Sequence, residues 1–394
     1  MVGLEVEIVR ATLVIGLTVS GLVYHFTRVS SGGVVTTPFL ALLVMTGRWD
    51  EILGWAVIAL LGVLAIRLVA TRWPVPRSWL FYFGIFVTTA IHVAGLELSG
   101  SETATRLEGL GLFLSAGLYV CSGLTAYDAV RQGIGRTFVA TALVTAAIVA
   151  IIIPLRYVTT TFGGPQPMVV ESPLRNPVLA LICVGMAVAM RIGPYWGTAG
   201  IIGGLYLLNI ASWQSILVVA AFALIGSWIY RSLADRLGIS RKERLYVLLA
   251  TGSLMSWFGL FWASWLGIPG AAEVSAYPIE PLIVIGLMIG ETVRYGVART
   301  VAGSAVVFAV TAAAAAILTA NPDLTLVVLA AAMALVIAII ALSLIRVRHE
   351  WAVALKGGDR WGVQPQNLSA MLSPRTQIRA LDAAPDSGKD SPRE

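Results

Sequence analysis

The stretch YDAVRQGIGRT, residues Tyr127–Thr137, places an acid, two arginines and two glycines in the middle of a long apolar sequence. The same arrangement returns as GETVRYGVART, residues Gly290–Thr300. Both stretches fit the pattern acid-x-Val-Arg-x-Gly-(Ile or Val)-x-Arg-Thr. Two copies of one pattern in a single chain indicate an internal duplication.

The composition predicts a membrane protein around these stretches. Of 394 residues, 58% are hydrophobic and 12% are charged, whereas about 25% of a soluble domain is charged. The net charge of +6 is therefore expected in cytoplasmic loops, and no nucleic-acid partner is expected. The two cysteines, Cys121 and Cys183, both fall in apolar runs and offer no disulfide framework.

Thirteen apolar segments are predicted to cross the membrane as helices. They are residues 8–26, 33–47, 52–70, 79–97, 109–127, 137–153, 177–193, 196–212, 213–230, 245–266, 279–292, 300–320 and 325–345. Segments 33–47 and 279–292 are shorter than the ~20 residues that cross a bilayer upright. We predict that both still cross, because a re-entrant segment 33–47 would place Arg67, Arg72 and Arg77 outside.

The distribution of charge predicts the orientation in the plasma membrane. If the N-terminus lies outside and every segment crosses, most Lys and Arg residues fall in inner loops and the outer loops are acidic. Glu5 and Glu7 precede the first apolar run, so we expect that helix to be retained rather than cleaved. The C-terminus is then cytoplasmic, and residues 349–394 are expected to form a largely disordered tail.

The duplication extends upstream of the repeated pattern. The stretch SSGGVVTTPFLALLVMTGRWDEIL (Ser30–Leu53) matches YWGTAGIIGGLYLLNIASWQSIL (Tyr195–Leu217) in its glycines and its terminal Trp and Ile-Leu. We therefore predict an all-α integral membrane protein made of two parallel six-segment repeats and a final helix. The predicted parts are repeats at 1–154 and 177–320, an extracytoplasmic linker at 155–176 and the final helix at 321–348.

Several stretches resemble one protein family. The first apolar segment, GGVVTTPFLAL (32–42), EGLGLFLSAGLYV (108–120) and the glycine-containing turn resemble the PgsC/CapC family, the membrane subunit of poly-γ-glutamate (capsule) synthase. The resemblance covers about residues 8–154 well and 177–320 more loosely. The chain therefore looks like two family modules fused, with an extra helix and tail.

The resemblance implies a function within a complex. Such a subunit anchors a cytoplasmic ATP-dependent amide ligase of the Mur-ligase type, works with a surface-facing subunit, and helps elongate or export the anionic polymer. ATP and a divalent metal would then bind the ligase. This chain has no nucleotide-binding motif and no metal-spaced cluster, so we expect it to hold no cofactor or metal and no catalytic site.

The repeated pattern supplies the candidate polymer- or partner-binding residues. They are Asp128, Arg131, Gly133 and Arg136 in the first copy and Glu291, Arg294, Gly296 and Arg299 in the second. The planar guanidinium suits a carboxylate, but arginines at inner helix ends also fix topology and meet anionic lipid. The acids either pair with the arginine three residues on or act as proton-coupling carboxylates.

Two further sets of residues have open alternatives. A basic loop, which either faces lipid or docks a cytoplasmic partner, contains Arg231, Arg236, Arg241, Lys242 and Arg244. Residues that either pack helices closely or break them beside a cavity are Gly32, Gly33, Pro38, Gly203 and Gly204.

The sequence thus favours a membrane subunit of a poly-γ-glutamate biosynthesis and export complex. The alternative is a stand-alone secondary transporter of a small anion, and a structural scaffold is a third. A coupled transporter usually carries an acid within a span, whereas the acids here fall at segment ends.

Overall fold

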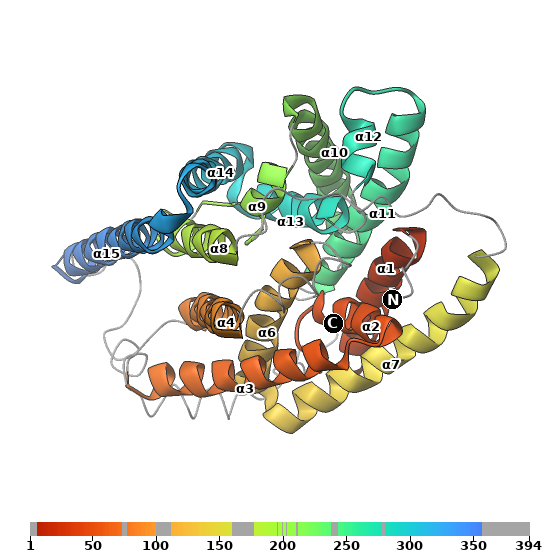
Figure 1. Ribbon diagram of the computed structural model, residues 1–394, viewed down its shortest axis with the longest axis horizontal. Helices are drawn as coiled ribbons and strands as arrows, with labels where there is room; N and C mark the ends of the chain where they lie inside the picture. The colour runs from red at the N-terminus through yellow and green to blue at the C-terminus, as the bar shows by residue number, and fades with distance from the viewer. Residues whose placement is uncertain are drawn as a thin grey trace, which may run out of the picture.

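The computed structural model is helical throughout the part of the chain that it describes (Figure 1). It describes residues 6–72, 77–99, 112–159, 177–194, 196–198, 200–201, 203–209, 212–237, 243–276 and 280–356. The first-half helices are α1 (Val6–Thr27), α2 (Thr36–Thr46), α3 (Trp49–Arg72), α4 (Arg77–Ser99), α6 (Leu112–Gln132) and α7 (Ile134–Thr159). Then follow α8 (Pro177–Ile192), α9 (Gly203–Asn209), α10 (Trp213–Leu237), α11 (Glu243–Trp265), α12 (Ala271–Ala276), α13 (Glu280–Tyr295), α14 (Val297–Ala320), η3 (Pro322–Leu324) and α15 (Thr325–Lys356).

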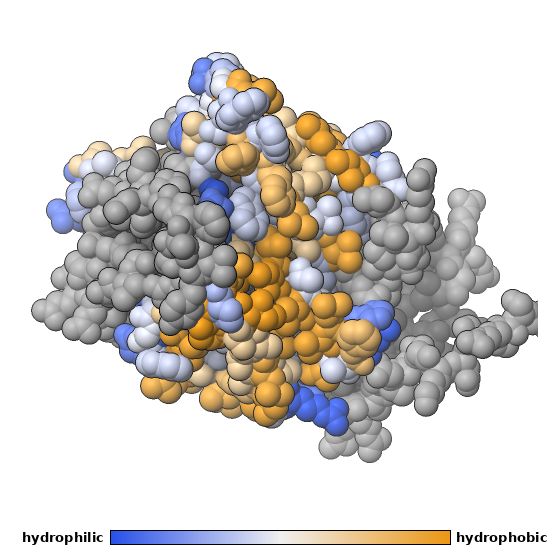
Figure 2. All heavy atoms as spheres, turned by 90° about the vertical axis from the view of Figure 1, so that its right-hand side faces the viewer, coloured by the Kyte–Doolittle hydropathy of each residue, from blue (hydrophilic) through white to orange (hydrophobic). Residues whose placement is uncertain are grey.

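Within these residues, seven helices are long and apolar enough to cross a membrane. Their apolar parts are Glu7–Thr27, Trp49–Arg72, Ile134–Leu155, Trp213–Ser232, Tyr246–Trp265, Val297–Ala320 and Pro322–Ser343. Helices satisfy all their backbone hydrogen bonds internally, as a lipid environment requires. One face of the molecule carries a broad patch of hydrophobic side chains (Figure 2). The predicted helical class is confirmed, and the apolar helices are compatible with a membrane-embedded protein.

Two predicted segments are helical over only part of their length. Segment 33–47 contains the 11-residue helix α2, which follows a non-helical stretch at 28–35, and segment 196–212 contains the seven-residue helix α9. Gly32 and Gly33 have φ angles of 74° and 100°, which side-chain-bearing residues rarely adopt. The glycines therefore delay the helix start.

The helices of the two halves pack in corresponding pairs. In the first half α1 contacts α2 and α7, and α6 contacts α3, α4 and α7; in the second half α8 contacts α9 and α14, and α13 contacts α10, α11 and α14. The contacts between halves also correspond, because α1 packs on α11 and α8 packs on α4. Each half thus places its first helix against the other half.

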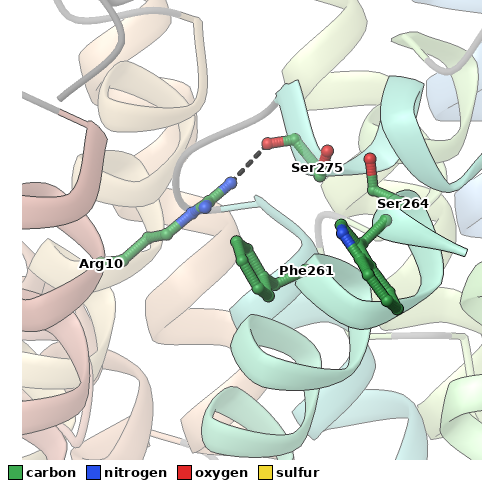
Figure 3. A pocket seen from close by; sticks show the side chains of 5 residues that line it. Arg10, Phe261, Ser264 and Ser275 are labelled. Atoms are coloured by element: carbon green, nitrogen blue, oxygen red, sulfur yellow. Dashed lines mark hydrogen bonds between the residues drawn. The ribbon is translucent and has the colours of Figure 1, made fainter.

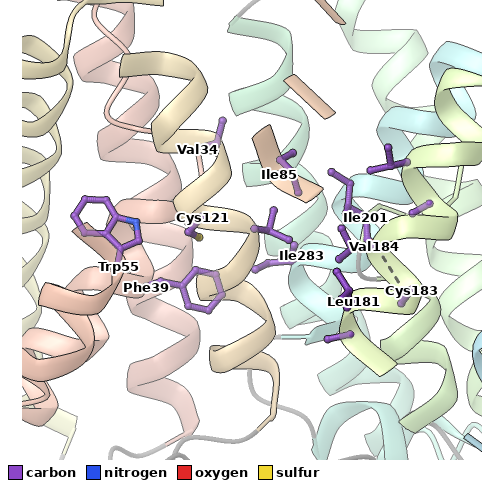
Figure 4. Close-up of a cluster of buried hydrophobic side chains, with 14 of the residues drawn as sticks. Val34, Phe39, Trp55, Ile85, Cys121, Leu181, Cys183, Val184, Ile201 and Ile283 are labelled. Carbon is purple, nitrogen blue, oxygen red and sulfur yellow. Dashed lines mark hydrogen bonds between the residues drawn. The ribbon is translucent and has the colours of Figure 1, made fainter. Parts of the chain in front are cut away.

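The largest buried cluster joins both halves (Figure 4). Phe39, Trp55 and Cys121 lie on one side of this cluster, and Leu181 and Ile201 lie on the other. Most of α8 is buried, since α15 covers it in addition to α4, α9 and α14. The two halves therefore share a hydrophobic core.

The last helix is longer than its predicted segment, 325–345. α15 runs through Lys356 and so enters the region predicted as tail. The residues after Lys356 lie outside the described part, as does most of the predicted linker at 155–176.

Candidate functional site

The first copy of the repeated pattern forms a corner between α6 and α7, which we call the first corner. Gly133 makes the turn with a φ of 100°. The Asp128 carboxylate accepts a hydrogen bond from Ser30 Oγ at 2.5 Å, and its Oδ1 lies 3.4 Å from Nη2 of Arg131. The predicted ion pair between residues three apart is therefore confirmed in this copy.

The first corner also holds the non-helical stretch before α2. Gln132 accepts a hydrogen bond from Ser30 N at 3.0 Å and donates one to Ser30 O at 2.5 Å. About two turns earlier, Thr125 Oγ1 donates to Gly32 O at 2.8 Å. The sequence reasoning missed Gln132, although a polar amide inside the repeated pattern was a usable signal.

The second copy forms the corresponding corner between α13 and α14, the second corner. Glu291 accepts hydrogen bonds from Thr198 N and from Gly200 N, the latter at 3.1 Å. Its carboxylate pairs with Arg191 at the end of α8, not with Arg294 as the spacing predicted. Arg191 was missed because only the fold brings the end of α8 to α13.

The acids of both corners thus have the same structural task. Each carboxylate binds the non-helical stretch that precedes a short helix, α2 in one half and α9 in the other. Both side chains are buried, at 12% exposure for Asp128 and 9% for Glu291. Buried carboxylates need such charge-assisted hydrogen bonds or ion pairs to stay ionised.

Both corners lie where the two halves meet, and there they differ. Near the second corner the Arg191 guanidinium lies 5.7 Å from the ring centre of Tyr82 on α4. At the corresponding contact between α1 and α11, Tyr24 stacks on Tyr246 with ring centres 5.4 Å apart. The ring of Tyr82 therefore meets a guanidinium at one contact, whereas the ring of Tyr246 meets another aromatic ring at the other.

The remaining arginines of the pattern point away from the interior. Arg136, Arg294 and Arg299 are exposed, whereas the Arg131 side chain is 29% exposed. The Arg294 guanidinium lies 5.1 Å from the ring centre of Tyr295, and Arg231 donates to Thr292 O at 3.3 Å. The fold thus brings one residue of the predicted basic loop, Arg231, to the second corner.

The rest of the predicted docking loop is only partly described. Arg236 lies on α10 and Arg244 on α11, but their side chains are outside the described part, as are Arg241 and Lys242 entirely.

Most of the predicted break-or-packing residues lie at close contacts. A Cβ on Gly33 would approach Leu124 to 2.7 Å, and one on Gly204 would approach Val307 to 2.7 Å. Pro38 lies in the first turn of α2, where it contacts Gly16 of α1, and a helix's first turn tolerates proline. Gly203 and Gly204 begin α9. These contacts support the packing role, and Gly32 and Gly33 also supply the break.

A surface pocket lies away from both corners, between α1 and the α11–α12 region (Figure 3). Its volume is about 270 Å³, and Arg10, Phe261, Ser264, Trp265 and Ser275 line it. The Arg10 guanidinium pairs with Glu7 at 2.8 Å and donates to Ser275 O. Arg10 therefore ties the first helix to the second half.

Within the described residues, no three His, Cys, Asp or Glu side chains are grouped so as to hold a metal ion. The sequence matches no family model, no curated protein and no solved structure.

Proposed function

We propose that this chain is the integral-membrane subunit of a poly-γ-glutamate biosynthesis and export complex. It anchors a cytoplasmic Mur-type amide ligase, which binds the ATP and divalent metal, and it helps elongate or export the anionic polymer with a surface-facing subunit. The observation that supports the proposal is which charged side chains of the corners are paired and which are exposed. Their acids are used internally, while Arg136, Arg294 and Arg299 remain exposed to an anionic partner.

The proposal includes a membrane layout with thirteen crossings, the N-terminus outside and the C-terminus cytoplasmic. Two six-segment repeats related by an axis along the membrane normal account for the corresponding helix contacts of the two halves. Both corners then face the cytoplasm. There the ligase, the polymer and anionic lipid headgroups all have access to the arginines.

The roles of the acids favour a subunit over a proton-coupled transporter. A coupling carboxylate must be able to exchange its proton during the cycle. Glu291 is instead paired with a buried arginine and bound to two backbone N–H groups, which stabilise the charged form.

One observation favours the second candidate, a secondary transporter of a small anion. Each half contains a non-helical stretch followed by a short helix, α2 or α9. Interrupted helices in corresponding positions of two repeats are typical of transporter binding sites. A transporter would bind its anion at these interruptions rather than at the exposed arginines.

Affinity purification from native membranes, followed by mass spectrometry, tests the proposal. Wild type should retain an ATP-dependent amide ligase, and the triple variant R136Q/R294Q/R299Q should lose most of it. The double variant R67Q/R72Q is the control, because it removes exposed charge from the end of α3 outside the corners. If wild type retains no ligase but takes up a small carboxylate in proteoliposomes, the transporter replaces the proposed function.

A further inference from the structure

The pocket between α1 and the α11–α12 region lies at the ends of two apolar helices. Arg10 is near the start of the apolar part Glu7–Thr27, and Trp265 is the last residue of the apolar part Tyr246–Trp265. If both helices cross a membrane, as in the proposed layout, the pocket lies at the depth of the lipid headgroups. This depth is the same whichever end of the chain lies outside.

The pocket has a guanidinium on one wall and aromatic rings on another. Arg10 is only 8% exposed, and its guanidinium pairs with Glu7 at 2.8 Å and donates to Ser275 O. Figure 3 shows this side chain reaching from α1 past the ring of Phe261 to Ser275 of α12, with Ser264 of α11 beyond the ring. A guanidinium has five N–H donors, so it can bind a further acceptor while it keeps these two contacts.

Exposed aromatic rings continue from the pocket along α11. Phe261 and Trp265 line the pocket and are 61% and 71% exposed, and Phe258 and Trp262 on the same helix are also exposed. The Trp262 ring meets those of Phe261 and Trp265 edge to face, with ring centres 6.1 Å and 5.6 Å apart. Aromatic rings are favoured at the membrane–water interface, where one end is apolar and the other is wet. This side of α11 is therefore suited to contact with lipid.

We infer that the pocket binds the phosphate of a membrane phospholipid, whose acyl chains lie against the exposed rings of α11. The Arg10 guanidinium and the Ser264 hydroxyl donate hydrogen bonds to the phosphate oxygens. The volume of about 270 Å³ suits a headgroup, so the acyl chains lie outside the pocket. Because Arg10 belongs to α1 and Ser264 to α11, the bound phosphate joins the first helix to the second half.

The charge beside the pocket predicts which phospholipids bind. Glu7 balances the charge of Arg10, and Trp257 Nε1 donates to the same carboxylate at 2.7 Å. The pocket therefore needs no net negative charge on the headgroup. Phosphatidylethanolamine should bind at least as well as phosphatidylglycerol, because its ammonium can approach Glu7, whose side chain is 45% exposed.

Native mass spectrometry of the delipidated full chain tests the inference. Phosphatidylethanolamine, phosphatidylglycerol and diacylglycerol are titrated against wild type, R10Q, W265A and the control W228A, which changes an equally exposed ring on α10 outside the pocket. R10Q should weaken phospholipid binding by roughly tenfold or more, since it removes a charge-assisted hydrogen bond. W265A should weaken it by about threefold, and W228A should leave it unchanged. Diacylglycerol, which lacks the phosphate, should bind weakly to all four proteins.

Two readouts do not depend on normal folding of R10Q. W265A changes a side chain that is exposed and contributes little to the core. E7Q leaves the charge of Arg10 unbalanced, so it should raise the affinity for phosphatidylglycerol relative to phosphatidylethanolamine by roughly two- to fivefold. Misfolding cannot imitate such a gain.

The outcomes separate this inference from the proposed function. Equal phospholipid binding by wild type, R10Q and W265A would overturn the inference, because the rings would then form only an interfacial belt. Diacylglycerol binding as tight as that of phospholipid would overturn it as well. If inorganic phosphate displaced the lipid at similar concentrations, the site would serve a soluble phosphate and the lipid would be rejected. The proposed function is decided separately, by whether the ligase is retained.

Discussion

Arg191 on α8 reaches Glu291 on α13, whereas Asp128, in the other copy of the same pattern, pairs with Arg131 on its own helix. The Arg191 side chain is only 10% exposed, and the Arg131 side chain is 29% exposed. Removing one partner of a buried pair leaves a charge without water or counter-ion, and this is far more costly than breaking a partly exposed pair.

The first prediction compares E291Q with D128N. E291Q should lower the free energy of unfolding by about 3–5 kcal/mol, because it leaves the buried Arg191 guanidinium without a counter-ion. D128N should lower it by about 1 kcal/mol, because the Arg131 side chain is already 29% exposed. Thermal unfolding of both variants in the same detergent gives the comparison.

The double variant R191Q/E291Q is the control for this prediction. Removing both charges should cost less than E291Q alone, since no unpaired ion remains. A cost of about 1 kcal/mol for E291Q, no larger than that of D128N, would mean that Glu291 is not held by a buried partner.

The second prediction concerns the turn at the second corner. Gly296 precedes α14 with φ 86° and ψ 157°, a region that only glycine occupies readily. G296A should therefore lower the free energy of unfolding by about 1–3 kcal/mol, although a Cβ there would meet open space. Chemical unfolding of the purified protein measures the loss.

G135A is the matched control at the first corner. Gly135 lies inside α7, and a Cβ there also meets nothing within 4 Å. This variant should be neutral or slightly stabilising, because alanine favours the helix. If G135A were as harmful as G296A, crowding rather than backbone conformation would be responsible.

The third prediction concerns the contact between α4 and α6. A Cβ on Gly123 would approach the backbone of Ile85, with its nitrogen at 2.9 Å, and a backbone cannot move aside as a flexible side chain can. G123A should thus cost about 1–3 kcal/mol through overpacking. G95A on α4, where a Cβ meets nothing within 4 Å, should be neutral or stabilising, and the melting temperatures of the two should diverge.

The fourth prediction tests the orientation. Val297 begins α14, and Asp323 lies in η3 just beyond the other end of that helix; both residues are exposed. With the N-terminus outside, D323C should react with a membrane-impermeant maleimide on intact cells, and V297C should react only after permeabilisation. The native cysteines are both buried, so wild type should give little background; the reverse pattern would invert the proposed topology.

The sequence predicts the helical class well, because long apolar runs leave few alternatives to a membrane helix. It also predicts the ion pair of Asp128 and Arg131, since three residues separate neighbours on one helix face. It does not predict Arg191, because a contact between α8 and α13 depends on tertiary packing. The late start of α2 within segment 33–47 is not predicted for a related reason: the backbone before it is stabilised by Gln132 and Thr125, about a hundred residues away.

The contacts of α1 with α11 and of α8 with α4 have a consequence for how such a protein evolves. Two identical modules joined as a symmetric dimer would form the same side-chain contacts at both of these places. A covalent fusion removes that constraint, because each contact can then mutate alone. The two contacts do differ, because Tyr82 meets the Arg191 guanidinium and Tyr246 meets the Tyr24 ring. A fused chain can therefore have two different contacts between its halves, as a heterodimer does. Two separate modules would in addition have to avoid pairing with copies of themselves.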